Sequence, residues 1–125
     1  MSGSAVFAEF VKEQMAGFGP VSIRRMFGGS GVFCDSRMFA LIINEVLYLK
    51  ADEALRPEFE AENLAPFSYA TKTGARTVLA YYRAPERCLD DPDEMTVWAR
   101  KAYDAALRAG LPKPKNKPSA AKPKR

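Results

Sequence analysis

Apolar residues recur at three- and four-residue spacing over residues 4–18, a pattern that predicts an amphipathic helix. Ser4 is placed to cap this helix, and Gly17, Gly19 and Pro20 are placed to end it. Its polar side carries Glu9, Lys12 and Glu13. The predicted buried stripe consists of Val6, Phe7, Phe10, Val11, Met15 and Phe18.

Six β-rich runs follow, four before a second helix and two after it. They cover residues 21–27, 32–34, 38–43, 46–50, 67–71 and 76–83. The glycine-rich segment 28–31 predicts a turn or bulge that needs positive φ. Asn44-Glu45 and residues 72–75 are typical of hairpin connections.

Two further helices are predicted from their start signals. Asp52 is placed to cap the first of these, with Leu55 and Phe59 facing inward. Pro57 either kinks that helix or marks its true start. The C-terminal helix has the clearest signals, which are an N-cap acid, proline at the first helical position, a capping-box glutamate and a terminal glycine. These are Asp91, Pro92, Glu94 and Gly110, with Trp98 and Tyr103 on the apolar stripe.

The predicted order is α-β-β-β-β-α-β-β-α, and the short connections imply a mainly antiparallel sheet with helices packed on one face. We therefore expect an α+β fold in one domain, residues 1–111, followed by a basic tail, residues 112–125.

The tail separates the charge of the chain into two parts. It has six basic residues and no acidic residue, and these are Lys113, Lys115, Lys117, Lys122, Lys124 and Arg125. The chain has 19 basic and 15 acidic residues, so the remaining body has 13 basic residues and a net charge of −2. With four prolines and no large apolar side chain, the tail is predicted to be disordered. It is suited to weak, salt-sensitive and sequence-independent contact with nucleic-acid phosphates. The alternative is a solubilising terminus that binds nothing.

Composition excludes several kinds of chemistry. The chain has no histidine, which excludes Ser-His-Asp and Cys-His catalysis and histidine metal sites. Cys34 and Cys88 lack metal-ligand spacing and are expected to be buried free thiols. The longest apolar run, residues 38–43, is too short to span a bilayer, and the first residues do not resemble a secretory signal. We expect a cytoplasmic protein that is not an enzyme and holds no metal or cofactor.

Arg24 and Arg25 are the most informative charged pair in the predicted sheet, because adjacent strand residues point to opposite faces. Arg25 is expected to share the core face with Val21 and Ile23, either in an internal ion pair or at the sheet edge as a contact for an anion or a partner. Arg24 is expected to point outward, where it is a second candidate for phosphate contact.

Other candidate sites are better explained by structure. Residues 28–31 lack the following helix and lysine of a phosphate-binding loop. The acidic residues 90–94 are accounted for by capping of the last helix. The paired aromatics Phe67, Tyr69, Tyr81 and Tyr82 resemble those that stack RNA bases, but one member of each alternating pair is expected in the core.

Several ordered blocks resemble the N-terminal domain of the TfoX/Sxy competence regulators, over roughly residues 5–107. The blocks are Arg24–Gly31, Phe39–Ile42, Leu47–Lys50, Pro66–Tyr69, Tyr81–Glu86 and Leu89–Glu94. The resemblance implies an α+β fold similar to that of secretion chaperones, in a bacterial cytoplasmic protein without catalytic residues. It also implies a role in controlling competence genes together with a cyclic-AMP-dependent transcription activator. Members of this type carry a second, helical C-terminal domain that this sequence lacks, so we expect a stand-alone member.

Together these observations favour a regulatory or adaptor domain whose body contacts a protein of the transcription machinery and whose tail contacts nucleic acid. A homodimer or other pure interaction module is the main alternative, because six strands leave sheet edges to cover. A small-molecule enzyme or sensor that uses Arg25 and the tyrosines is a more distant one.

Overall fold

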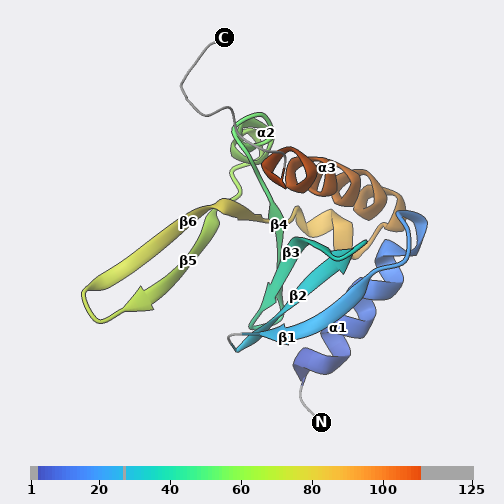
Figure 1. The fold of residues 1–125 in the computed structure, drawn as a ribbon, viewed down its shortest axis with the longest axis horizontal. Coiled ribbons are helices and arrows are strands. Elements are labelled where there is room, and N and C mark those ends of the chain that lie inside the picture. The colour runs from blue at the N-terminus through green and yellow to red at the C-terminus, as the bar shows by residue number, and fades with distance from the viewer. Residues whose placement is uncertain (1–2, 27, 111–125) are drawn as a thin grey trace.

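A computed structural model describes residues 3–26 and 28–110 of the 125-residue chain. The fold is α+β, with one six-stranded antiparallel sheet and the predicted order of elements (Figure 1). The sequence prediction of the fold class is therefore confirmed. None of the helices in the described part of the chain has the length and apolarity needed to cross a membrane.

The N-terminal helix α1 (Gly3–Gln14) continues into the short 3₁₀ helix η1 (Met15–Gly17). Val11 and Met15 are fully buried, but Val6 is 59% and Phe10 36% exposed. The prediction that both lie in the buried stripe was wrong, because a helix on one side of a sheet covers it with a narrower strip of side chains. The side chain of Gln14 anchors the end of α1 by donating to the carbonyl of Cys88 at 3.1 Å.

Four strands follow as a meander. They are β1 (Ser22–Met26), β2 (Gly29–Cys34), β3 (Arg37–Ile43) and β4 (Val46–Lys50). The Asn44-Glu45 hairpin is confirmed, and both residues have the positive φ that two-residue hairpin turns require. An irregularity in register opposite Phe39 lets Phe39 and Ala40 both face the core, although they are adjacent in sequence.

The glycine-rich segment was predicted to be a turn throughout, but β2 already begins at Gly29. Only Gly28 has a positive φ, of 80°. A Cβ at Gly29 would collide with the carbonyl oxygen of Ile42 and with Cδ1 of Ile43, and one at Gly31 would lie 2.7 Å from Sδ of Met38. Gly29 is therefore favoured by close packing against the backbone of β3, and Gly31 by its contacts with the side chains of Met38 and Met26, and neither is required by turn geometry.

Helix α2 (Arg56–Ala61) starts with Pro57 in its first turn, which decides between the two predicted roles of that proline. Asp52 lies before the helix and accepts a hydrogen bond from the backbone of Leu55 at 2.9 Å, so it caps the preceding turn. Phe59 projects from α2 into the core and stacks on Tyr82, with ring centroids 5.2 Å apart and planes at 16°.

The second hairpin consists of β5 (Pro66–Thr71) and β6 (Gly74–Arg83). The strand order is β1-β2-β3-β4-β6-β5, so β6 pairs with β4 and the sheet ends at β5. The outer part of this hairpin projects away from the rest of the domain (Figure 1).

The 3₁₀ helix η2 (Glu86–Leu89) leads into α3 (Pro92–Gly110), which packs on β3 and β4. Asp91 caps α3 as predicted, since its side chain accepts from the backbone of Asp93 at 2.9 Å. The Glu94 carboxylate instead accepts from Arg87 at 2.8 Å. Trp98 and Tyr103 are buried as expected.

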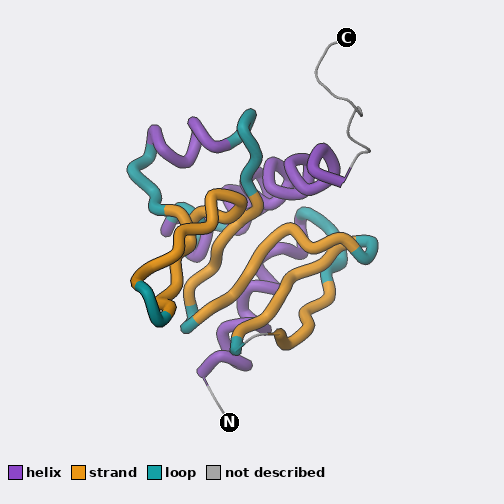
Figure 2. The backbone as a smooth tube through the Cα atoms, turned by 60° about the vertical axis from the view of Figure 1, so that its left-hand side comes forward, coloured by secondary structure: helices purple, strands orange, loops and turns teal. Residues whose placement is uncertain are grey.

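The core lies between one face of the sheet and the helices, with α1 and α3 behind the strands in Figure 2. Phe39 is fully buried there, with its ring centroid 5.2 Å from that of Phe18 and 5.8 Å from that of Tyr103. No helix in the described part of the chain covers the other face of the sheet (Figure 2).

Candidate functional site

The face of the sheet turned away from α1 and α3 is the candidate functional surface, and we call it the open face. Cross-strand partners share a face of a sheet, so the register from β1 to β6 identifies its residues. Beyond the irregularity at Pro66/Phe67, the hairpin is linked to this face by Phe67, whose ring centroid lies 5.0 Å from that of Tyr48. The open face comprises Ser22, Arg24, Met26, Phe33, Met38, Leu41, Ile43, Val46, Tyr48, Lys50, Phe67, Tyr69, Arg76, Tyr81 and Arg83, together with glycines of β2.

Charge is divided sharply between the sheet and the rest of the domain. The six strands contain no acidic residue, although the chain has 15. They contain six basic residues, which are Arg24, Arg25, Arg37, Lys50, Arg76 and Arg83. The body has a small negative net charge, but its sheet is basic.

Four of these basic residues lie on the open face, and two of them lie over aromatic rings. The guanidinium carbon of Arg24 is 4.1 Å from the centroid of Phe33, and Nζ of Lys50 is 5.1 Å from that of Tyr81. Burial lowers the pKa of Lys50 and raises the pKa of Tyr81 to about 12. Arg76 and Arg83 are opposite Tyr69 and Tyr48 in register. None of the four forms an ion pair with any residue that the structure describes.

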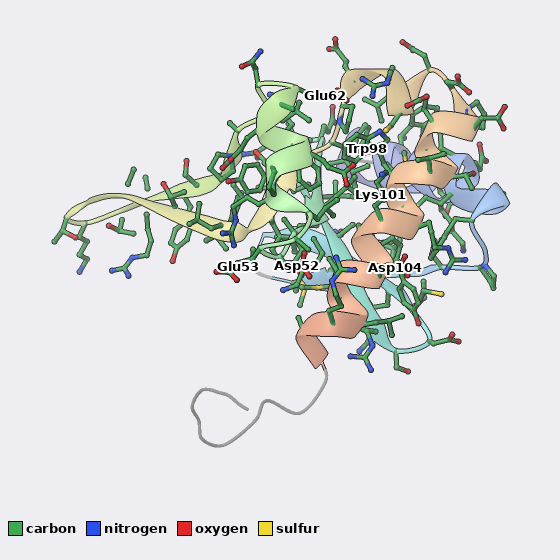
Figure 3. The ribbon with its side chains drawn as sticks, turned by 90° about the horizontal axis from the view of Figure 1, so that it is seen from above. Asp52, Glu53, Glu62, Trp98, Lys101 and Asp104 are labelled. Carbon is green, nitrogen blue, oxygen red and sulfur yellow. The ribbon has the colours of Figure 1, made fainter. Side chains whose placement is uncertain are left out.

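The helical side differs in part, because three of its basic residues, Arg87, Lys101 and Arg108, are paired with acids, and Figure 3 shows Lys101 on this side. Arg87 contacts Glu62 at 2.7 Å and Glu94 at 2.8 Å, and Lys101 contacts Glu58 at 2.8 Å. Hydrogen bonds from Arg108 hold the pKa of the Asp52 carboxyl below its ordinary value, and those from Arg87 do the same for Glu62. The ion pairs among the described residues therefore all lie on the helical side, and none involves a basic residue of the sheet.

A hollow of about 690 Å³ opens on this face between the projecting hairpin and the ends of β1 and β3. Its walls are mainly apolar. The lining residues are Met26, Leu41, Ile43, Asn44, Phe67, Ser68, Tyr69 and Ala70. Tyr69 is 45% exposed, so an aromatic ring stands in solvent at the rim.

Four consecutive residues of β5, from Phe67 to Ala70, line this hollow. Successive strand residues point to opposite faces, so the hollow runs along the length of β5 and is not bordered by the side chains of one face alone. The outer edge of β5 is free in the described part of the chain, since β5 pairs only with β6. The site therefore places a mainly apolar hollow beside a strand with a free edge.

A family model for the TfoX N-terminal domain matches residues 13–106, which is well over half of the chain. The chain belongs to the TfoX N-terminal domain family. This confirms the resemblance that the sequence blocks indicated. Among curated proteins, none matches the sequence.

Within this TfoX-type domain, the two arginines predicted from the sequence lie on opposite faces of β1. Arg24 points outward onto the open face, as expected. Arg25 is exposed and borders a separate hollow of about 440 Å³ between β1 and α1, together with Ala8 and Glu9. It forms no ion pair with the described residues, so the predicted internal ion pair is not found among them, and a contact of Arg25 with an anion or a partner stays a prediction. The six basic residues of the tail lie outside the described residues.

Sequence reasoning missed most of the open face. Leu41 and Ile43 were assigned only to a strand, and Phe67 and Tyr69 were placed in a strand and compared with base-stacking residues, with one of the two expected in the core. Of the two adjacent tyrosines, Tyr82 lies in the core and Tyr81 on the open face, as the predicted alternation requires, although Tyr81 is only 8% exposed. One signal was available in the sequence, namely the absence of any acid from all six strands.

The two cysteines are free thiols in different surroundings. Cys88 is buried, and burial raises the pKa of its thiol to about 12. Cys34 is only half-buried, and its pKa is raised as well, first by burial and then by Asp35. A thiol with a raised pKa holds little thiolate near neutral pH, so neither cysteine is suited to nucleophilic chemistry.

Proposed function

We propose that this protein is a non-enzymatic bacterial regulatory or adaptor domain of the TfoX N-terminal type, acting in the cytoplasm. Its body contacts a protein partner of the transcription machinery, and its basic tail adds weak, sequence-independent contact with nucleic acid. The observation that carries the proposal is the division of charge in a member of this family. A body with net charge −2 bears a tail with six basic residues and no acid.

The tail is suited to a nucleic-acid backbone by its charge alone. Each lysine or arginine that neutralises a phosphate releases counterions, so affinity falls steeply with salt and does not depend on sequence. Lys113, Lys115, Lys117, Lys122, Lys124 and Arg125 are the proposed contacts, with Arg24 as a secondary one. A positively charged arm of this kind speeds encounter with DNA and leaves specific recognition to the partner.

The test is fluorescence anisotropy of labelled duplex DNA over a series of salt concentrations, with the full chain and with a full-length variant whose six tail residues are replaced by glutamine. We expect the variant to bind more weakly, with the slope of log affinity against log salt reduced by up to about 5. Equal binding by both proteins would move the nucleic-acid site to the body. No binding by either would remove the nucleic-acid part of the proposal.

An alternative function is favoured by the open face, which has a mainly apolar hollow and a free strand edge. In this case the protein is an interaction or homodimerisation module with no nucleic-acid role. Light scattering over a concentration series separates the two forms of this alternative, because a strict monomer excludes the homodimer.

A further inference from the structure

Beyond Pro66 at its start and the register irregularity beside it, β5 lacks the features that normally keep a strand edge from pairing. Edges are commonly guarded by charged residues, proline or a covering element. The other edge strand, β1, has Arg24 and Arg25 and lies next to α1. From Phe67 to Thr71, β5 has no charged residue and no proline. A strand edge left open in this way, beside an apolar hollow, is suited to accept another strand.

The hollow lies where the side chains of an added strand would fall. A strand paired with β5 places every second side chain on the open face, above Met26, Leu41 and Ile43. A hollow of about 690 Å³ is large enough for several aliphatic side chains. Asn44 is the main polar side chain on its floor, so the hollow offers little for recognition of a polar small molecule.

The charged residues around the hollow indicate which kind of molecule can bind there. Arg24 is two residues from Met26 on the same face of β1, and Arg76 is opposite Tyr69 on β6. Lys72 is exposed in the turn at the hairpin tip. Glu45 is the nearest acid in sequence, but it borders another hollow, with Arg83 and Glu86. The rim is thus basic and calls for acidic residues in the segment that binds.

The same positive charge argues against a second copy of the domain or its own basic tail as the bound molecule. Two copies joined through β5 would bring like-charged rims together, and the tail of this chain, with six basic residues and no acid, would be repelled. Nucleic acid would satisfy the arginines but not the backbone groups of β5. The rings of Phe67 and Tyr69 already stack on each other, with centroids 5.9 Å apart and planes at 26°, which leaves less ring surface for bases.

We propose that the open face binds an extended peptide segment of a protein partner by strand addition to β5, and that this segment has alternating aliphatic residues flanked by acidic residues. The segment hydrogen-bonds to the free backbone edge, places its aliphatic side chains over Met26, Leu41 and Ile43, and presents its carboxylates to Arg24 and Arg76. This rests on the proposed function as an adaptor and names the chemistry of its partner.

The test uses the full chain and a labelled synthetic peptide of nine residues, in which three valines alternate with threonines between pairs of terminal glutamates. Its affinity is measured by fluorescence anisotropy. A second peptide has lysines in place of the glutamates. Two further versions are N-methylated, one at the valine nitrogens and the other at the threonine nitrogens. Alternate amides of a strand point to opposite sides, so strand addition requires that one methylated version loses binding and the other keeps it.

Two variants of the protein test the site, and each has a matched control. Leu41→Glu places a charge on the floor of the hollow. Its control, Val97→Glu, introduces the same charge on α3, at a side chain that is 49% exposed. Arg76→Glu reverses a charge on the rim, and Lys12→Glu makes the same change on α1. We expect the first member of each pair to weaken peptide binding by at least about tenfold and the control to stay within about twofold. Circular dichroism and thermal unfolding establish that all four variants are folded.

Equal binding of the lysine peptide, or of both methylated peptides, would overturn the proposal, and so would binding that survives Leu41→Glu. Peptide binding that is displaced by single-stranded DNA would assign the face to nucleic acid. A dimer in sedimentation analysis that dissociates in Leu41→Glu would assign it to a second copy. If the peptide does not bind but tail-dependent DNA binding is observed, only this inference is rejected. If neither peptide binding nor tail-dependent DNA binding is observed, the proposed function is rejected as well.

Discussion

The guanidinium of Arg24 lies over the ring of Phe33, with its central carbon 4.1 Å from the ring centroid. The two residues are on adjacent strands and the same face of the sheet. The contact holds a positive charge on the open face without an acidic partner. A surface of this kind can attract an acidic ligand, since no internal carboxylate has to be displaced.

We expect Arg24→Gln to lower the free energy of unfolding by about 0.5–1 kcal/mol, the usual worth of an exposed cation–π contact. Urea unfolding measures this directly. Arg25→Gln is the matched control, because Arg25 is the next residue and is also exposed but makes no described ion pair or ring contact. An equal loss in both variants would mean that the Arg24–Phe33 contact contributes nothing of its own.

The stack of Phe59 on Tyr82 joins α2 to the sheet. Phe59 is fully buried, so Phe59→Ala should lower the free energy of unfolding by about 3–5 kcal/mol, because burial is lost and a cavity is left behind. Tyr82→Phe removes only the hydrogen bond that its hydroxyl donates to Glu60 at 3.1 Å, and should cost about 1 kcal/mol. Denaturant unfolding of the two variants should give this order, and a reversed order would contradict the assigned packing.

The glycines of β2 should differ in their tolerance of alanine. At Gly31 the added Cβ meets the flexible ends of Met38 and Met26, which can move aside. Gly31→Ala should therefore lower the free energy of unfolding by at most about 1 kcal/mol. At Gly29 it meets the backbone carbonyl of Ile42, which cannot move without disturbing β3, so the cost should reach about 2–3 kcal/mol or prevent folding. Thermal unfolding distinguishes the two variants, and equal costs would contradict the packing described for β2.

Stability should fall in acid. Hydrogen bonds from Arg108 and Arg87 lower the pKa values of Asp52 and Glu62, so each folded carboxyl binds its proton less tightly than the unfolded one. The resulting stability is fully present above the ordinary values of 3.8 and 4.5 and is lost as the pH falls through the lowered folded values.

Urea midpoints should therefore stay level from pH 7 to about pH 5 and then decrease. In Arg108→Met the decrease should be smaller, because Asp52 then has an ordinary pKa in the folded state. A steeper acid decrease in Arg108→Met than in the parent protein would contradict the pairing of these two residues.

The sequence predicted the elements better than it predicted the surface. Asn44-Glu45 was correctly identified as a turn, because two-residue hairpins have a strong local signal. The extent of β2 was wrong, because Gly29 and Gly31 are selected by contacts with Ile42 and Met38 on a neighbouring strand, which local patterns do not reveal.

The open face was not predicted because it depends on which strands are neighbours. The placement of β6 between β4 and β5 brings Phe67 against Tyr48 and leaves β5 as a free edge. That order follows from packing over the whole domain. By contrast, the outward direction of Arg24 could be predicted, since it needs only the alternation of one strand.

The most direct test of the central claim, that the open face is the binding surface of the domain, is an NMR titration of the isotope-labelled full chain with the valine-rich acidic peptide. We predict that backbone amide shifts will change in β5 and around Met26, Leu41 and Ile43, while those of α1 and α3 stay constant. Changes confined to the helices, or spread evenly over the domain, would contradict the claim.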